Sequence, residues 1–253
     1  MTGTTLAGRT AIVTGASRGI GRGIAERFAD EGANVVLAAR SVEALGDVLS
    51  AIGRRGGHAL VVATDITAED AAETIVSRTL SEFGRVDVLV NNAGGNSFMS
   101  PLATMRMSGW HKTVALNLDS TVHLMHAVLP HMIERGSGSI INVSSIAGLR
   151  GIPMMAHYGA AKAAVISVTQ SVAVEVAPQG VRVNALVPGW IETDLTGFLR
   201  TDEAIEDSVL SDVPMGRWGT VDEIAEGALF LASDASSFMT GQSLILDGGL
   251  SSH

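Results

Sequence analysis

The sequence contains no cysteine, and aromatic residues make up only 4% of it. The absence of cysteine excludes disulfides, thiolate nucleophiles, cysteine-ligated zinc and ordinary iron–sulfur clusters. No run of about 18 apolar residues is present, as a membrane span would require, and residues 1–9 lack the apolar core of a signal peptide. We therefore expect a cytoplasmic protein without membrane contact.

Positive charge is also scarce, since 17 Lys and Arg face 26 Asp and Glu, giving a net charge of −9. An acidic surface repels phosphate backbones, so we expect no nucleic-acid partner. The 253 residues, 46% of them hydrophobic, fit one large α/β domain spanning residues 1–253.

Short β-branched runs alternate with longer alanine-rich stretches along the chain. The runs are continuously apolar, which is typical of strands buried on both faces. The predicted strands are Thr10–Thr14, Asn34–Ala39, His58–Thr64, Val86–Asn91, Ser139–Ser144, Val181–Val187 and Ser243–Leu246. The predicted helices are Gly19–Glu31, Val42–Arg54, Ala68–Phe83, Ser108–Arg135, Ala156–Ala177 and Val221–Ser233. The pattern predicts a single-domain Rossmann-type α/β fold, a doubly wound sheet of seven mainly parallel strands flanked by helices. The irregular segment at about 190–219 is predicted to be a substrate flap.

A glycine-rich turn follows the first predicted strand and opens the first helix. Glycines let the backbone approach a pyrophosphate, and a helix N-terminus offers free N–H groups to it. The predicted dinucleotide-binding residues of this turn are Gly15, Ser17, Arg18, Gly19, Ile20 and Gly21. An ordinary tight strand-to-helix turn is the alternative.

Arg40, at the end of the second predicted strand, indicates which dinucleotide binds. NAD sites usually carry an acid there, which binds the ribose 2′-hydroxyl. Arg40 can instead bind a 2′-phosphate, and Arg18 can add a second guanidinium. The expected cofactor is NADP(H), unless both arginines are merely solvated.

Tyr158 and Lys162 are four residues apart in a predicted helix and therefore lie on one face. A free phenol has a pKa near 10, and a neighbouring ammonium favours its ionised form. Tyr158, the one tyrosine of the chain, can then give a proton to a carbonyl or take one from an alcohol. Ser145, after the fifth predicted strand, can hydrogen-bond the substrate oxygen. No metal is expected, because His123, His126 and His131 lack further ligands, and His157 is interpreted as incidental.

With these motifs the chain resembles short-chain dehydrogenases/reductases, in particular bacterial 3-oxoacyl-acyl-carrier-protein reductases, from about Leu6 to Gly249. The resemblance implies a catalytic tetrad of Asn117, Ser145, Tyr158 and Lys162, in which Asn117 holds a water that links Lys162 to solvent. Lys162 would also bind the nicotinamide ribose, beside Tyr158. The further cofactor contacts that it implies are Asp65, Ile66, Asn91, Ala93, Gly94, Pro188, Gly189, Ile191 and Thr193.

The leading functional hypothesis is an NADPH-dependent carbonyl reductase that acts on a small-molecule ketone, best a 3-oxoacyl thioester. An NAD(P)-dependent alcohol or hydroxysteroid dehydrogenase is the alternative enzyme, and a non-catalytic dinucleotide sensor is the alternative of another class. Delivery by an acidic carrier protein is opposed by the net charge of −9 and by the few basic residues near Arg135 and Gln179.

The helix Ala156–Ala177 is apolar on most sides, so it needs a second partner besides the sheet. A two-fold pairing of this helix and Ser108–Arg135 between copies of the chain would cover it. The apolar end strand Ser243–Leu246 could form a second two-fold contact. We therefore expect a homotetramer.

Overall fold

The computed structural model describes residues 5–194 and 196–252, and in this part of the chain seven parallel strands form one sheet. Their spatial order is β3-β2-β1-β4-β5-β6-β7. The chain thus starts in the middle of the sheet, builds outwards to β3, and returns to β4 beside β1. The bounds are β1 Thr10–Thr14, β2 Asn34–Ala39, β3 His58–Ala63, β4 Val88–Asn91, β5 Gly138–Val143, β6 Val181–Pro188 and β7 Ser243–Leu246.

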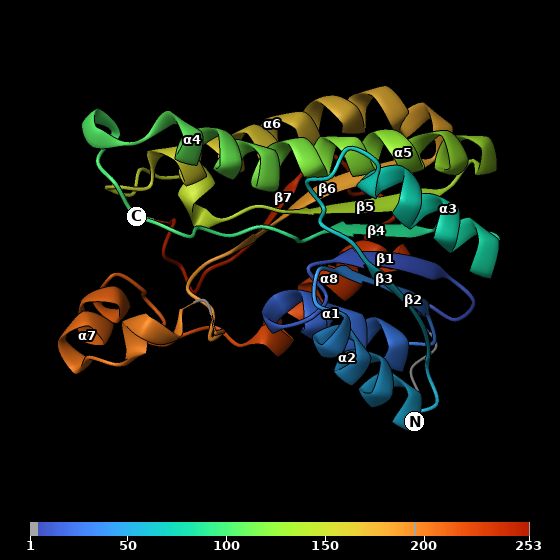
Figure 1. Ribbon diagram of the computed structural model, residues 1–253, viewed down its shortest axis with the longest axis horizontal. Helices are drawn as coiled ribbons and strands as arrows, with labels where there is room; N and C mark the ends of the chain where they lie inside the picture. Colours follow the sequence, from blue (N-terminus) through green and yellow to red (C-terminus); the bar gives the residue numbers. More distant parts are fainter. Residues whose placement is uncertain (1–4, 195, 253) are drawn as a thin grey trace.

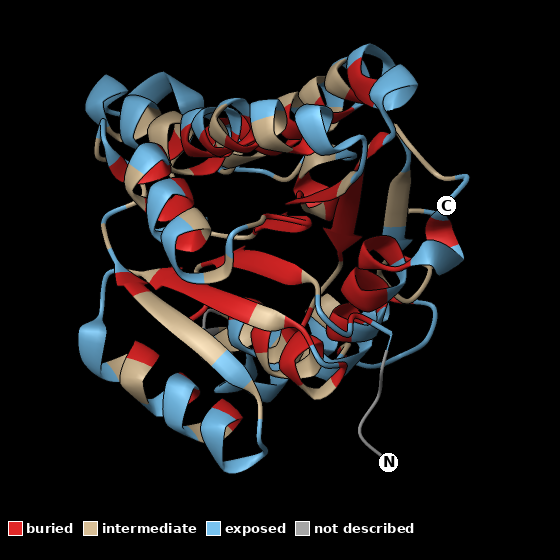
Figure 2. Ribbon diagram, turned by 90° about the vertical axis from the view of Figure 1, so that its right-hand side faces the viewer, coloured by how far each residue is buried: buried red, intermediate tan, exposed pale blue. Residues whose placement is uncertain are grey.

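Helices cover both faces of this sheet (Figure 1). One face carries α1 Gly19–Asp30, α2 Val42–Arg54 and α8 Val221–Ala232, whose apolar sides pack with the strands into one core cluster. The other carries α3 Ala71–Phe83, α5 Ser120–Arg135 and α6 Ala156–Val176, with α4 Met107–Val114 preceding α5. The central strands are buried on both faces (Figure 2), which explains their continuous apolar sequences. The predicted Rossmann-type fold is confirmed, with all seven strands parallel.

The helix predicted over Ser108–Arg135 is interrupted by a π-helical turn, Ala115–Asp119, between α4 and α5. The turn adds a residue to the helical repeat, and Asn117 at its centre is fully buried. The predicted helical stretch is therefore confirmed in extent, and the π-helical turn inside it was not predicted. The inserted residue is hard to detect in the sequence, because the apolar periodicity is nearly the same on both sides of it.

The segment predicted as an irregular flap contains a helix, α7 Glu203–Ser211. Asp202 caps it, since its carboxylate accepts from the backbone N–H groups of Ala204 and Ile205. None of the residues of α7 is buried, so this helix adds nothing to the core of the domain. Leu195, in the same predicted flap, lies outside the described residues.

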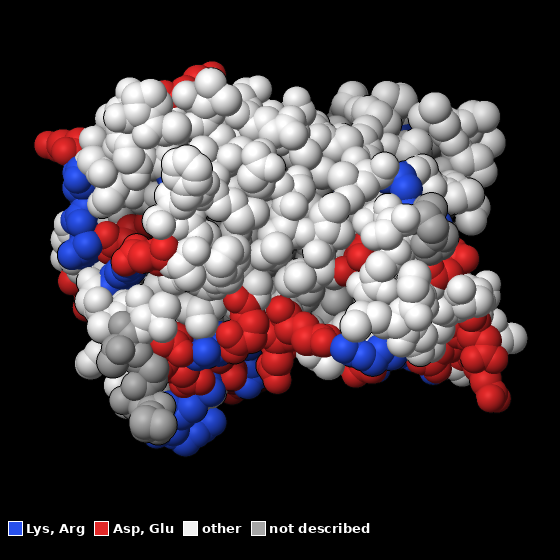
Figure 3. Space-filling view, turned by 180° about the vertical axis from the view of Figure 1, so that it is seen from behind, with Lys and Arg blue, Asp and Glu red and all other residues white. Residues whose placement is uncertain are grey.

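The outward side of α6 is almost free of charge. Its exposed positions include Ala160, Ala163, Ser167 and Val174, and the first exposed charge is Glu175. Seen from behind, the upper part of the molecule is a broad surface with few charged side chains (Figure 3). The stretch Ala156–Gln179 is also long and apolar enough to cross a membrane by length and composition, a property that core helices of soluble proteins share.

Candidate active site

The glycine turn between β1 and α1 is closed so tightly that side chains are excluded from it. A Cβ on Gly21 would lie 2.3 Å from the Gly15 carbonyl oxygen, and one on Gly15 would lie 2.8 Å from Nδ2 of Asn92. Gly15 and Gly19 also have φ of +65° and +53°, which favours glycine. Asn92 fixes the turn from β4, because its Nδ2 donates to the carbonyl oxygen of Thr14 at 2.8 Å.

The N-terminus of α1 is left open toward solvent. Arg18 at the N-cap provides no side-chain cap, and the backbone N–H groups of residues 19–21 donate to no acceptor in the described part of the chain. Unpaired N–H groups and the positive end of the helix dipole attract an anion at such a terminus. Ser17 and Ile20 flank this opening, and both are half-buried. The turn therefore fits the pyrophosphate of a dinucleotide.

Two arginines near this turn have exposed side chains. Arg18 and Arg40 are exposed, and neither forms an ion pair with another described residue. Asp65, after β3, lies near enough to Arg40 for its charge to help lower the pKa of that carboxyl, although the main cause is hydrogen bonding from Thr67. Ile66, half-buried, packs against the core beside it. The arrangement offers unpaired guanidinium groups where a 2′-phosphate would lie.

Tyr158 and Lys162 lie together on one face of α6, as their spacing predicts. The ammonium Nζ is 5.8 Å from the centre of the Tyr158 ring and donates to the carbonyl oxygen of Val143 at 2.8 Å. Lys162 is buried, and burial lowers its pKa to about 8. The pKa of Tyr158 is raised by burial, and a hydrogen bond with Ser145 opposes part of that rise. The lysine is therefore poised to titrate near neutrality, whereas the phenol still holds its proton there.

The helix α6 packs closely against the segment that carries Ser145. The Ser145 hydroxyl accepts from the backbone N–H of Ala147 at 3.2 Å and begins a single 3-10 turn, Ile146–Gly148. A Cβ on Gly148 would lie 2.8 Å from the Lys162 carbonyl carbon. A Cβ on Gly159 would lie 2.8 Å from the Ala147 carbonyl oxygen. Both glycines thus allow the close approach that brings Ser145 to Tyr158.

Asn117 uses its side chain to fix the segment after β4. Its Oδ1 accepts from the Gly95 backbone N–H at 2.9 Å, and its Nδ2 donates to the carbonyl oxygens of Gly95 and Thr113 at 3.1 and 3.0 Å. Gly94 lies between Asn117 and Lys162, since a Cβ there would be 2.7 Å from Oδ1 and 3.2 Å from Nζ. The four predicted tetrad residues are therefore brought to one end of the sheet from three separate segments, since Tyr158 and Lys162 share α6.

Asn91 and Ala93, at the end of β4, are held by different contacts. The amide of Asn91 is buried and donates to Oδ1 of Asn142 on β5 at 2.9 Å, while its own Oδ1 has no partner among the described residues. The backbone N–H of Ala93 donates to the Thr14 hydroxyl at 2.9 Å. The side chain of Asn91 thus joins β4 to β5, while Ala93 lies beside the glycine turn.

The predicted nicotinamide-side residues follow β6 into the flap. Gly189 closes onto β7, because its N–H donates to the Leu246 carbonyl oxygen at 2.9 Å and a Cβ there would meet Asp247 at 2.7 Å. Pro188 is the last residue of β6, and Ile191 pairs with Gly219 in an isolated parallel bridge. Thr193 faces the glycine turn, since a Cβ on Gly19 would lie 3.5 Å from its methyl carbon.

The two ends of the flap are clamped to each other. Gly219 donates its N–H to the Trp190 carbonyl oxygen at 2.9 Å, and the Trp190 and Trp218 rings meet edge-on with centres 6.1 Å apart. Trp190 also packs on a small apolar cluster of Ile146, Val213 and Leu250. The flap is therefore anchored at both ends, and the cluster on which Trp190 packs includes Ile146, the residue after Ser145.

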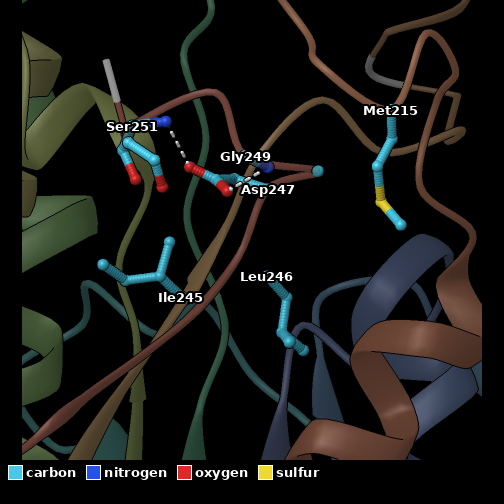
Figure 4. A pocket seen from close by; sticks show the side chains of 8 residues that line it. Met215, Ile245, Leu246, Asp247, Gly249 and Ser251 are labelled. Carbon is cyan, nitrogen blue, oxygen red and sulfur yellow. Dashed lines mark hydrogen bonds between the residues drawn. The ribbon is translucent and has the colours of Figure 1, made fainter.

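A surface cavity of about 430 Å³ lies beside this anchor (Figure 4). The Asp247 carboxylate, at its centre, accepts from the backbone N–H groups of Gly249 and Ser251 at 2.9 and 2.8 Å. A second cavity of about 140 Å³ reaches from there toward Trp190 and Ile191. Neither cavity is lined by a tetrad residue, and both are lined in part by the flap, so they lie against the flap rather than at the tetrad.

His157 has a place in the site that the sequence interpretation missed. The imidazole is fully buried, its Nε2 lies 2.9 Å from Oδ1 of Asn96, and the Phe98 ring stacks on it at 4.2 Å and 16°. Successive helical residues do point in different directions, but the chain after β4 wraps around α6 and covers this side as well. No pattern in the sequence pairs residue 157 with residues 96 and 98.

Comparison with known proteins agrees with this geometry. A family model described as "Enoyl-(Acyl carrier protein) reductase" matches residues 15–251. The 3-oxoacyl-[acyl-carrier-protein] reductase FabG of Chlamydia trachomatis is 43% identical over 251 residues, 97% of this chain and 98% of that protein. The chain belongs to the short-chain dehydrogenase/reductase family.

Other members of this family act on different molecules. The cis-4-hydroxycyclohexanecarboxylate dehydrogenase of Sinomonas cyclohexanicum is 40% identical and covers 98% of both chains. The crystal structure of a gluconate 5-dehydrogenase from Burkholderia cenocepacia, in complex with NADP and tartrate, superposes with a TM-score of 0.94 at 36% identity, covering 100% of this chain and 98% of that one. This short-chain dehydrogenase/reductase is therefore an NAD(P)-dependent oxidoreductase that acts on a small-molecule ketone or alcohol.

Proposed function

We propose that this enzyme uses NADPH to reduce the ketone of a 3-oxoacyl thioester, with Tyr158 as the proton donor. The contact of Tyr158 with Ser145 and Lys162 carries the proposal, because it joins a phenol, a hydroxyl and a buried ammonium at one end of the sheet. The likeness to 3-oxoacyl-[acyl-carrier-protein] reductases supports the choice of substrate.

The bound cofactor supplies a hydride to the carbonyl carbon. Tyr158 gives its phenolic proton to the carbonyl oxygen, and Ser145 donates a hydrogen bond to the same oxygen and orients it. Lys162 stabilises the phenolate that remains and, with its pKa of about 8, can exchange protons at neutral pH. Asn117 keeps Gly94 and Gly95 in place and, through a water on its backbone, would connect Lys162 to solvent. The open glycine turn Gly15–Gly21 would bind the pyrophosphate, and Asp65, Ile66, Asn91 and Ala93 the adenosine half.

The preference for NADPH follows from Arg18 and Arg40. A 2′-phosphate placed between two free guanidinium groups gains charge-assisted, paired hydrogen bonds that a ribose hydroxyl cannot form. Pro188, Gly189, Ile191 and Thr193 would hold the nicotinamide from the flap side.

A free or coenzyme A thioester suits this surface better than a carrier-bound one. Arg135, one of the few basic residues near the helix ends, is already paired with Asp87 at 3.3 Å. The flap carries seven acids and two arginines between residues 192 and 217. An acidic carrier protein would meet like charge there.

A cytoplasmic homotetramer completes the proposal. The uncharged outer side of α6 and the separate apolar positions Phe238 and Ile245, fully and 40% exposed, are two surfaces on which two-fold contacts would bury apolar area.

The activity is tested by following NADPH absorbance at neutral pH with 3-oxoacyl-coenzyme A thioesters of increasing chain length, diketones, quinones and 3-ketosteroids. The proposal expects the 3-oxoacyl thioesters to have the highest kcat/KM, and expects NADH to be at least tenfold less effective. Turnover confined to another compound class would refute the proposed substrate, and NADPH binding with no turnover of any of them would leave only a sensor.

A further inference from the structure

The segment that follows β4, residues 94–100, is held in place at three points along its length. At its start, Asn117 binds both backbone groups of Gly95. At its end, the backbone N–H of Ser100 donates to the Met154 carbonyl oxygen at 2.9 Å. Between these two points, its attachment to α6 is made through His157, directly before Tyr158.

The contacts of His157 are specific in direction. Nε2 lies 2.9 Å from Oδ1 of Asn96, so it donates its proton to that acceptor. The ring stacks on Phe98, and Phe98 in turn fills the space over Gly109 of α4, where a Cβ would be 2.8 Å from Cζ. His157 therefore sits at the point where α6, the segment 94–100 and α4 meet.

The second ring nitrogen of His157 has no use in this packing. Nδ1 is buried and has no hydrogen-bond partner among the described residues. A purely apolar contact would be served better by leucine or phenylalanine, which leave no buried polar atom unpaired. The imidazole adds the bond to Asn96 and an interaction with the Phe98 backbone, which neither apolar side chain would form.

The segment that His157 contacts carries one exposed methionine and is hydrogen-bonded to a second. Met99 is 49% exposed, and Met154, joined to the same segment through Ser100, is 46% exposed with a φ of +63° that non-glycine residues rarely adopt. Unbranched thioether side chains adapt to apolar ligands. Moving Asn96 would move Met99 relative to Tyr158.

We propose that His157 is a positioning residue, which holds the segment 94–100 through Asn96 and Phe98 and so sets the affinity for the chain of the carbonyl substrate. Its side-chain partners, Asn96 and Phe98, are not tetrad residues. This inference rests on the proposed reduction of 3-oxoacyl thioesters.

The test compares steady-state kinetics of His157→Leu and His157→Gln with the wild-type enzyme. Leucine keeps an apolar side chain but loses the donor to Asn96, whereas glutamine retains an N–H donor. We expect His157→Leu to raise KM at least fivefold for a medium-chain 3-oxoacyl thioester and less for acetoacetyl-coenzyme A. For His157→Leu we expect kcat to change by less than threefold and NADPH affinity to stay the same. For His157→Gln we expect the KM for the medium-chain thioester to recover at least half of the increase, measured on a logarithmic scale.

A second variant separates positioning from folding. Asn96→Leu should reproduce the KM increase, and the double variant should add little, since both changes remove one bond. Asn96→Leu also serves as the test on its own if His157→Leu is unfolded and fails to bind NADPH. His58→Leu, at the exposed start of β3, is the matched control and should change nothing.

Three results would overturn the inference: an unchanged KM with only a lower Tm, an equal loss for short and medium chains, or additive effects of the two single variants. A wild-type enzyme that reduces no 3-oxoacyl thioester would instead refute the proposed function. The two failures are therefore told apart by the wild-type assay.

Discussion

Replacing Lys162 by methionine should make the cofactor-free protein more stable while removing its activity. Lys162 is 4% exposed, and its burial lowers its pKa from 10.5 to about 8. The folded state therefore holds the charged form less readily than the unfolded chain does. At pH 7 both states are largely protonated, and burial of the charge costs about 3 kcal/mol, at about 1.36 kcal/mol for each pH unit between the two pKa values.

The sign of the pH dependence follows from the lowered pKa. The unfolded chain binds more protons than the folded protein between about pH 8 and pH 10.5, so the wild-type protein gains stability as the pH rises through this range. The cost of burial falls to about 1 kcal/mol at pH 9.5 by the same linkage relation. Methionine removes the cost but leaves the Val143 carbonyl oxygen without its donor, a loss of about 1 kcal/mol that does not depend on pH.

We therefore expect Lys162→Met to be more stable than wild type by about 2 kcal/mol at pH 7, and expect the difference to shrink by about 2 kcal/mol at pH 9.5. The chain suits this measurement because it has two lysines, one tyrosine and no cysteine, so few other groups titrate between these pH values. Urea unfolding at both pH values measures the difference, with Lys112→Met, at an exposed position, as the matched control.

A Lys162→Met protein that is less stable than wild type at pH 7, or whose stability difference is the same at both pH values, would refute the reasoning. Activity should be lost in either case, because the phenolate of Tyr158 then lacks its cation.

Further variants test separate parts of the site. Tyr158→Phe should lower kcat by about 10²–10⁴-fold without weakening NADPH binding, since only the proton donor is removed; near-normal turnover would contradict the mechanism. Gly94→Ala places a methyl group 2.7 Å from Asn117 Oδ1 and 3.2 Å from Lys162 Nζ, so kcat should fall at least tenfold while urea unfolding still shows a folded protein; unchanged kcat would show that the segment yields freely. Ala39→Asp combined with Arg40→Gln should reverse a preference for NADPH of at least tenfold, about 1.4 kcal/mol, in titrations with both cofactors; equal affinity of the parent enzyme for both would argue against the two-arginine site. Light scattering at micromolar concentration should give four times the chain mass of 26.1 kDa, whereas a monomer would rule out the assembly.

The sequence by itself determined the sheet and the chemical identity of the site. All seven strands were predicted within a few residues, because strands buried on both faces must be continuously apolar and must be separated by helices long enough to cross over. The glycine turn and the Tyr158–Lys162 spacing were also evident, because local backbone geometry fixes what such short motifs can do.

Only the tertiary structure decided how distant segments complete the site. The π-helical turn at Asn117 adds a single residue to the helical repeat and left no periodic signal in the sequence. The short helix α7, which buries none of its residues, was not predicted either. Burial lowers the pKa of Lys162 and raises that of Tyr158, and burial depends on everything packed around α6. His157 was interpreted as incidental because its neighbours in the chain give no sign of Asn96 and Phe98. Those contacts come from the path of the chain after β4, which packing sets, and short-range sequence patterns do not encode it.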